Sequence, residues 1–336
     1  MLYNDIGVLA AATAFGKTVL GAYLIAQKKV NALVLVHNVE IMNNWIKDLS
    51  SFLTINEELP TYTTPKGRVK KRSSLIGTFS SQKDSTTGII DIAMITSLGR
   101  EDNINELVRN YGMVIVDECH HAAAVTHENV LRAVTARYVY GMSATINRGD
   151  KQDKKMFMQL GPIRHRYTAK ERAQKQGIGH YIYPRFTRLV DLNQSEDKNP
   201  SDYYRLIMQS ELRNMQIVSD VIDCVKRGRT PVVMTKYKEH AQKLYDMLQG
   251  VADHVFLLQG GKSLKERAAI REQMAAVRAD ESLVLVAIGQ YVGEGFNYPR
   301  LDTMLLAMPI SFEGNVEQHA GRLNRDYEGK KDAIIF

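Results

Sequence analysis

The first half of the chain alternates between short apolar runs and longer stretches of mixed polarity. The apolar runs are rich in β-branched residues, which is typical of strands buried on both faces of a parallel sheet. They lie at Ile6–Ala10, Ala32–Val36, Ile89–Ile95, Val114–Val116 and Tyr138–Met142. The stretches between them predict helices at Val19–Gln27, Val39–Phe52 and Glu101–Asn110, and Thr54–Gly88 is expected to be polar and irregular. The alternation predicts an α/β domain.

The second half repeats this pattern after a long polar segment. The predicted strands are Arg185–Leu192, Pro231–Lys236, Val255–Gln259, Leu283–Ile288, Thr303–Ala307 and Ala333–Phe336. The predicted helices are Asp202–Lys226, Glu239–Leu248 and Ser263–Arg278. We therefore expect a second domain of the same class, with helices on both faces of a parallel sheet.

Two carboxylates, Asp117 and Glu118, directly follow the buried run at 114–116. Ligands of open parallel sheets bind at the carboxyl ends of the strands. An acidic pair at that edge needs a cation, and a phosphate–Mg²⁺ complex is the candidate that fits it. This interpretation requires a phosphate-binding loop elsewhere in the chain.

A candidate phosphate loop lies at residues 11–18, between a predicted strand and a predicted helix. Small residues let backbone N–H groups approach phosphates at a helix N-terminus, which favours anions. Lys17 would contact the β/γ-phosphates, and the hydroxyl of Thr18 would bind Mg²⁺. Ala11 and Ala14 stand where such loops often have Gly, so we expect a loop that needs no positive φ at these positions.

Hydroxyl side chains follow two other predicted strands. Thr96 and Ser97 come after the run that ends at Ile95, which places them on the ligand side of the sheet. Ser143 and Thr145 follow the run that ends at Met142. Hydroxyls beside an acidic pair could couple one ligand to another, and the alternative is a plain helix N-cap.

Several other residues could have either a functional or a purely structural role. Trp45, the only tryptophan, is expected to pack in the core rather than to stack on a base. The basic run at 66–72 fits a solvated loop and a phosphate-contacting loop equally well. His120, His121 and His127 have untidy spacing and are not expected to bind a metal, and Cys119 is expected to be a half-buried spacer.

Composition sets broader limits. The chain has 336 residues, enough for two domains, and its net charge of +7 leans mildly towards a polyanionic partner. Its two cysteines exclude a disulfide framework or a cysteine-based zinc site and favour a reducing compartment, so we expect a cytoplasmic protein. We see no signal peptide and no apolar run long enough to span a bilayer, so a membrane partner is not expected.

Four motifs in this order resemble the core of a superfamily-two helicase of the DEAD/DEAH-like type, here with a DECH box. They are Ala11-x4-Gly16-Lys17-Thr18, Asp117-Glu118-Cys119-His120, Ser143-Ala144-Thr145 and Gln318-x2-Gly321-Arg322-x2-Arg325. Residues 289–299 resemble the fifth motif of that family, and the resemblance covers nearly the whole chain. In finer detail the sequence looks similar to helicase subunits of bacterial restriction and phage-defence systems.

The resemblance implies an α/β fold with two tandem RecA-like parallel-sheet domains and a cleft between them that holds ATP and Mg²⁺. Residues 1–183 would form the ATP-binding domain, with 151–183 leading into the hinge, and residues 184–336 the C-terminal domain with motifs four to six. The phosphate loop begins about ten residues into the chain, and the chain stops in a predicted strand, so we expect a fragment of a longer protein or an incomplete gene.

The resemblance also assigns roles to individual residues. Glu118 would activate water, and Gln318, Arg322 and Arg325 would act on the γ-phosphate, with the two arginines on one helical face. The nucleotide would be bound by Ala14, Phe15, Gly16, Lys17 and Thr18, and the metal by Thr18 and Asp117. Coupling to domain motion would involve His120, Ser143 and Thr145, and nucleic acid would contact Thr96, Ser97, Lys236, Gly293 and Gly295.

The function implied by this resemblance is ATP hydrolysis that drives movement along nucleic acid, with DNA favoured over RNA. Nuclease or other subunits of a defence system would be its protein partners. Two alternatives stay open: a nucleotide-gated remodeller of RNA or DNA, and a truncated DNA-binding module that does not translocate by itself.

Overall fold

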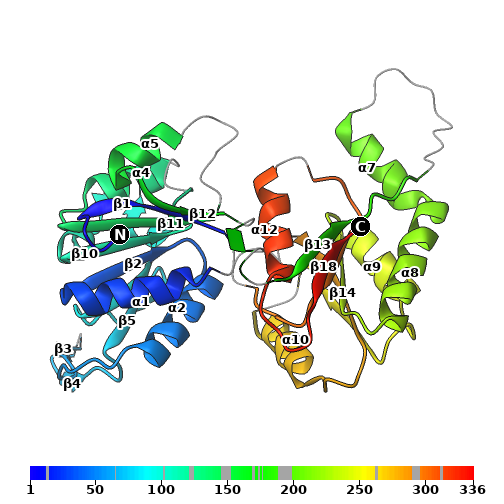
Figure 1. Cartoon of the computed structure of the whole chain (residues 1–336). Helices are drawn as coiled ribbons and strands as arrows, with labels where there is room; N and C mark the ends of the chain where they lie inside the picture. The colour runs from blue at the N-terminus through cyan, green and yellow to red at the C-terminus, as the bar shows by residue number, and fades with distance from the viewer. Residues whose placement is uncertain are drawn as a thin grey trace. The chain divides into compact units, whose positions relative to one another are not determined.

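The chain divides into two compact units, Met1–Arg172 and Ala173–Phe336 (Figure 1). The computed structural model describes residues 1–12, 15–64, 66–100, 103–120, 125–144, 153–168, 171–172, 175, 177–187, 199–261, 264–289, 296–310 and 313–336. The division precedes the expected boundary at 183/184. Its cause is the strand Gly179–Ile182, which pairs with Asp332–Ile335 and so lies in the sheet of the second unit.

Unit 1 is built on one large sheet. Its strands are β1 (Ile6–Ala11), β2 (Ala32–Val36), β5 (Ile76–Ser80), β6 (Lys83–Asp84), β7 (Ile90–Met94), β10 (Met113–Asp117), β11 (Tyr138–Ser143) and β12 (Ile163–Tyr167). Their order is β12-β1-β11-β10-β2-β7-β5-β6, and the strands pair in parallel except for β5 with β6. Two small hairpins, β3 (Thr61–Thr63) with β4 (Val69–Lys71) and β8 (Gly99–Arg100) with β9 (Asn103–Ile104), accompany the sheet.

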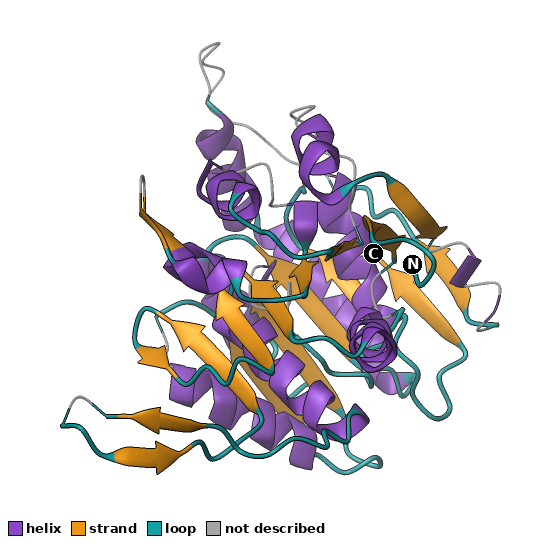
Figure 2. Cartoon of the chain, turned by 90° about the vertical axis from the view of Figure 1, so that its left-hand side faces the viewer, coloured by secondary structure: helices purple, strands orange, loops and turns teal. Residues whose placement is uncertain are grey.

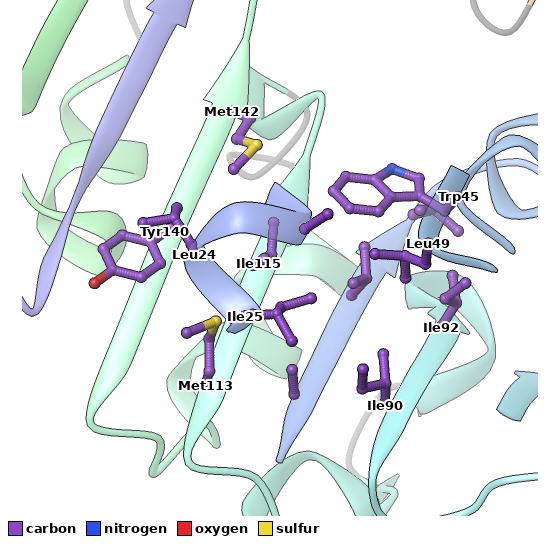
Figure 3. Packing of buried hydrophobic residues seen from close by; sticks show 14 of the residues in the cluster. Leu24, Ile25, Trp45, Leu49, Ile90, Ile92, Met113, Ile115, Tyr140 and Met142 are labelled. Carbon is purple, nitrogen blue, oxygen red and sulfur yellow. The ribbon is translucent and has the colours of Figure 1, made fainter. Parts of the chain in front are cut away.

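Helices cover both faces of this sheet (Figure 2). They are α1 (Lys17–Lys28), α2 (Val39–Phe52), α3 (Ile95–Leu98), the 3-10 helix η1 (Glu106–Arg109), α4 (Val125–Arg132) and α5 (Asp153–Leu160). Successive residues of β10 face opposite layers: Ile115 packs with α1 and α2 (Figure 3), and Val116 packs with the remaining helices. Strands that are apolar on both faces are therefore buried on both faces, as predicted.

Unit 2 has a six-stranded, fully parallel sheet in the order β13-β18-β17-β14-β16-β15. The strands are β13 (Gly179–Ile182), β14 (Pro231–Thr235), β15 (His254–Leu258), β16 (Leu283–Ile288), β17 (Thr303–Leu306) and β18 (Asp332–Ile335). The helices are α7 (Pro200–Gln209), α8 (Glu211–Lys226), α9 (Lys238–Met247), α10 (Leu264–Ala276) and α12 (Glu313–Leu323). Helices α8 and α9 pack on one face of the sheet, and α10 and α12 on the other.

Four expectations about elements are corrected. The segment expected to be irregular contains β5, and the helix expected at 101–110 is reduced to η1 in the described residues. The single helix expected at 202–226 is two helices, which break at Ser210. The strand expected at 185–192 is not found at 185–187, and the edge strand of this sheet is β13 instead. Residues 188–192 lie outside the described part. In the described part of the chain, no helix is both long and apolar enough to cross a membrane.

Candidate functional site

Three neighbouring strands of unit 1 bring the candidate residues to one edge of the sheet. Strand β11 lies between β1 and β10, and the register pairs Ala10 with Ser143 and Asp117 with Met142. The phosphate loop follows β1, and the acidic pair ends β10. These residues are far apart in sequence, and the parallel order of the strands places them side by side at their carboxyl ends, where ligands of such sheets bind.

The phosphate loop begins later than its motif suggests. Ala11 is the last residue of β1, in extended backbone, so no glycine is needed there. Gly16 caps α1 with a φ of 91°, so the position that requires a positive φ does carry glycine. The ring of Phe15 lies 4.8 Å from that of Tyr167, centroid to centroid, which anchors the loop to β12. Ala14 lies outside the described residues.

Glu118 lies in a turn directly after β10. Its φ is 46°, a left-handed conformation that costs a non-glycine residue about 1–3 kcal/mol. With this turn, Glu118 Oε1 lies 2.8 Å from Lys17 Nζ. Such strain is concentrated at active sites and ligand clamps, so the turn is consistent with a functional glutamate.

The second oxygen of Glu118 meets the predicted coupling residues. Ser143 Oγ donates to Glu118 Oε2 at 3.3 Å, and Oε2 lies 3.4 Å from His120 Nδ1. His120 Nδ1 and Ser143 Oγ are themselves 2.9 Å apart. The structure thus joins Lys17, Glu118, His120 and Ser143 in one network, whereas Thr145 lies outside the described residues.

The two neighbouring carboxyls have opposite electrostatic environments. Burial alone would raise the pKa of Glu118, but the charge of Lys17 and the hydrogen bond with His120 outweigh it and hold that pKa well below its usual range. For Asp117, burial and the charge of Glu118 raise the pKa despite the opposing effects of Lys17 and Trp45. Divergent pKa values in adjacent acids are typical of catalytic sites.

Asp117 and Thr18 offer the oxygen donors that Mg²⁺ prefers. The Asp117 carboxyl is buried beside another acid, and a bound cation would offset that repulsion. Thr18 lies half-buried in the first turn of α1. The donor set therefore fits Mg²⁺.

Trp45 is buried, as predicted, but it also contacts this site. Its Nε1 donates to Asp117 Oδ2 at 2.8 Å. The only sequence signal was a lone tryptophan in an otherwise ordinary amphipathic helix, so this link to the acidic pair was missed.

The two candidate arginines of unit 2 do not share a helical face, because α12 ends at Leu323 and Arg325 follows it. Their guanidinium groups nevertheless reach one carbonyl. Arg322 Nη1 donates to Phe296 O at 3.1 Å and Arg325 Nη2 at 3.3 Å, and Arg325 also donates to Asn297 Oδ1. The side chain of Gln318 lies outside the described residues.

A half-buried lysine, Lys330, which sequence analysis missed, fixes the backbone around Arg325. Lys330 Nζ donates to the carbonyls of Leu301, Leu323 and Arg325 at 2.8, 3.0 and 2.9 Å, and to that of Pro299. Burial lowers the pKa of this ammonium to about 8. Lys330 thus ties the end of α12 to the segment that leads into β17.

The three nucleic-acid candidates that the structure describes follow strands β7 and β14. Thr96 is exposed on α3, after β7, and the neighbouring Ser97 Oγ accepts a hydrogen bond from Ser81 N at 3.0 Å. Lys236 follows β14, and its Nζ lies 4.4 Å from the ring centroid of Tyr204 and 5.7 Å from that of Tyr237.

Both tyrosines beside Lys236 were missed, although a lysine can contact a phosphate and a neighbouring aromatic ring can stack on a base. Two further nucleic-acid candidates, Gly293 and Gly295, lie outside the described residues.

Cys119 is fully buried rather than half-buried. A Cβ added at Gly141 would lie 3.0 Å from its Sγ, so the thiol fills the space beside β11. Burial raises the pKa of this thiol, which makes it a poor nucleophile. His127 is buried on α4, and His121 lies outside the described residues.

Residues 3–148 match the family model described as "Type III restriction enzyme, res subunit". The chain is 24% identical to "Transcript termination protein A18" of fowlpox virus, over 98% of its own length and 68% of that protein. It is also 24% identical to "Probable helicase D10" of Escherichia phage T5, over 99% of its length and 67% of that protein.

The fold is similar to that of a solved restriction enzyme. The structure of "ATP-dependent Type ISP restriction-modification enzyme LlaBIII bound to DNA" matches 99% of this chain and 26% of that chain, with a TM-score of 0.60 and 14% identity. Tandem RecA-like units are therefore the architecture of this chain. The chain corresponds to about two thirds of the two viral relatives and to a much smaller part of the restriction enzyme.

Proposed function

We propose that this chain, a superfamily-two helicase core related to restriction-enzyme subunits, hydrolyses ATP to move along nucleic acid, with DNA as the favoured track. Its helicase relatives, although of low identity, support a helicase- or translocase-type ATPase in general. The observation that carries the proposal is the network of Lys17, Glu118, His120 and Ser143 at the ends of adjacent strands.

In the proposed cycle, Lys17 leaves Glu118 and binds phosphate oxygens of ATP. Backbone N–H groups of residues 14–18 bind the same phosphates. The Oε1 atom of Glu118, released by this exchange, would orient the attacking water and accept its proton, while Oε2 stays beside Ser143 and His120. Thr18 and Asp117 would hold Mg²⁺, which would supply positive charge to offset that of the phosphates.

Residues of unit 2 complete the proposed chemistry. Arg322 and Arg325, with Gln318, stabilise charge on the transferred phosphoryl group. An arginine in this role can be worth ~10³–10⁵ in rate. His120, Ser143 and Thr145 would couple hydrolysis to conformational change.

Nucleic acid would contact Thr96 and Ser97 in unit 1 and Lys236, Gly293 and Gly295 in unit 2. These contacts would go mostly to phosphates, so binding should weaken with salt and depend little on sequence. DNA is favoured because the family model is named for a restriction-enzyme subunit and the similar solved enzyme is bound to DNA. For the same reason we propose nuclease or other defence-system subunits as partners.

The test is the steady-state ATPase rate with double-stranded DNA, single-stranded DNA and RNA, at low and moderate salt. Glu118→Gln should keep ATP binding and lose turnover, because the amide cannot accept the proton. Glu106→Gln is the matched control, since this carboxylate pairs with Arg109 at the surface of unit 1. Stimulation by one polymer would identify the track. No turnover with any polymer, in folded protein, would contradict the proposal and favour a binding module.

A further inference from the structure

The indole of Trp45 connects the hydrophobic core of unit 1 to a candidate metal ligand. The side chain is 1% exposed, and its one polar group, Nε1, donates to Asp117 Oδ2 at 2.8 Å. The other carboxylate oxygen, Oδ1, accepts from Glu118 N at 2.9 Å. Each oxygen of Asp117 therefore has one fixed donor, which sets the orientation of the carboxylate.

The same indole packs against the helix that follows the phosphate loop. A Cβ added at Gly21 of α1 would collide with Trp45 Cη2 and lie 2.9 Å from Cζ3. The same point lies 3.7 Å from Ile115 Cδ1 of β10, so the six-membered ring fills the space between α1 and β10 (Figure 3). Because Thr18 begins α1 and Asp117 ends β10, one side chain touches both elements that carry the proposed metal ligands.

We propose that Trp45 is a positioning residue that holds Asp117 in the orientation that binds Mg²⁺ together with a nucleotide. This assignment rests on the proposed ATPase function. A residue that only filled the core would need no polar atom, whereas a buried indole N–H needs an acceptor. Here the acceptor is the metal ligand itself, and hydrogen bonds from such outer partners orient metal ligands.

The decisive variant is Trp45→Phe, which keeps an aromatic ring and removes the N–H donor. We expect the Mg²⁺ concentration needed for half-maximal binding of a fluorescent ADP analogue to rise roughly 10–100-fold, the usual effect of losing an outer partner of a metal site. Affinity for the analogue at saturating Mg²⁺ should change much less. A merely structural role would lower stability without this selective change in Mg²⁺ dependence.

A second variant separates the hydrogen bond from packing. Gly21→Ala in the Trp45→Phe background places a methyl group in the volume that the six-membered ring vacates. We expect this double variant to recover thermal stability but not Mg²⁺ affinity. Recovery of Mg²⁺ affinity, or a folded Trp45→Phe protein with the wild-type Mg²⁺ dependence, would overturn the assignment.

The wild-type chain carries its own probe, because Trp45 is its only tryptophan. We expect its emission to change when ADP binds with Mg²⁺, and to change less with ADP in EDTA. If the protein binds the Mg²⁺–ADP analogue but its tryptophan emission is constant, the Trp45 assignment fails and the ATPase proposal stands. If the wild-type protein does not bind the analogue at all, both fail.

Discussion

His240 is a buried histidine whose environment favours the neutral form. Its Nδ1 lies 2.8 Å from Thr235 Oγ1 and its Nε2 3.0 Å from Asn214 Oδ1. Burial first, and then the charges of Arg213 and Lys243, lower its pKa from 6.5 to about 4. The ring therefore remains neutral in the folded state at pH values where it would already be protonated in the unfolded chain.

This shift predicts a loss of stability in acid. Between pH 6.5 and 4 the unfolded state binds a proton that the folded state does not. The free energy of unfolding should therefore decrease by about 3 kcal/mol at most as the pH is lowered from 6.5 to 4. His240→Gln should flatten this part of the curve, measured by urea unfolding followed by circular dichroism at each pH. Above pH 7 the two curves should run parallel. Equal slopes from pH 6.5 to 4.5 would contradict the prediction.

At the residue scale, the positions of functional residues could be predicted where these residues directly follow a predicted strand. Asp117, Glu118 and Ser143 each follow an apolar run, so their position at the edge of the sheet could be inferred from sequence. The partners of these residues could not, because contacts such as Trp45 with Asp117 and Lys330 with the carbonyls around Arg325 depend on packing between distant segments.

At the element scale, β3 and β4 form a basic hairpin in the segment whose role the sequence left open (Figure 1). Lys70 and Lys71 are exposed on β4, and the guanidinium of Arg72 lies 4.3 Å from the ring centroid of Tyr62. Antiparallel pairing holds these cations in an ordered strand rather than in a loose loop. We therefore expect the hairpin to contact nucleic-acid phosphates.

Replacing both hairpin lysines with glutamate should weaken nucleic-acid binding about tenfold and lower the salt slope by roughly two, about one per lost phosphate contact. Fluorescence anisotropy at several salt concentrations measures both quantities. The matched control is Lys47→Glu with Lys154→Glu, which changes the charge equally at exposed sites of the same unit. Equal weakening in both double variants would indicate a general charge effect and no hairpin contact.

Helices and strands were predicted correctly where a run of residues is continuously apolar and buried. They were missed where contacts between distant segments determine the structure. The core strands β2 and β16 were found at their observed bounds. Strand β5 was missed because it is short and mixes apolar with polar residues, so that its place in the sheet depends on pairing with β7. The break between α7 and α8 was missed; in the structure Asn214 spans it, with Nδ2 donating to Met208 O at 2.9 Å.

At the scale of the whole molecule, two units of similar architecture carry different parts of the proposed chemistry. Unit 1 holds Lys17, Asp117 and Glu118, which would bind the nucleotide and activate the attacking water, while unit 2 holds Arg322 and Arg325. Nucleotide binding and turnover should therefore be separable by substitution. Of the two arginines, Arg322 is the more buried, so Arg325 is the better one to change without disturbing the fold.

Arg325→Lys should lower turnover while leaving nucleotide affinity close to that of the wild type. Lysine keeps the charge but loses the planar fork that contacts phosphate in two places, so we expect kcat to fall at least about 100-fold. Arg278→Lys, which changes an exposed arginine paired with Asp280 in the same unit, should leave kcat unchanged. The measurement compares the stimulated ATPase rate with the affinity for a fluorescent ADP analogue. An Arg325 variant with unchanged kcat would remove this residue from the mechanism, and a parallel loss of affinity would assign it to nucleotide binding instead.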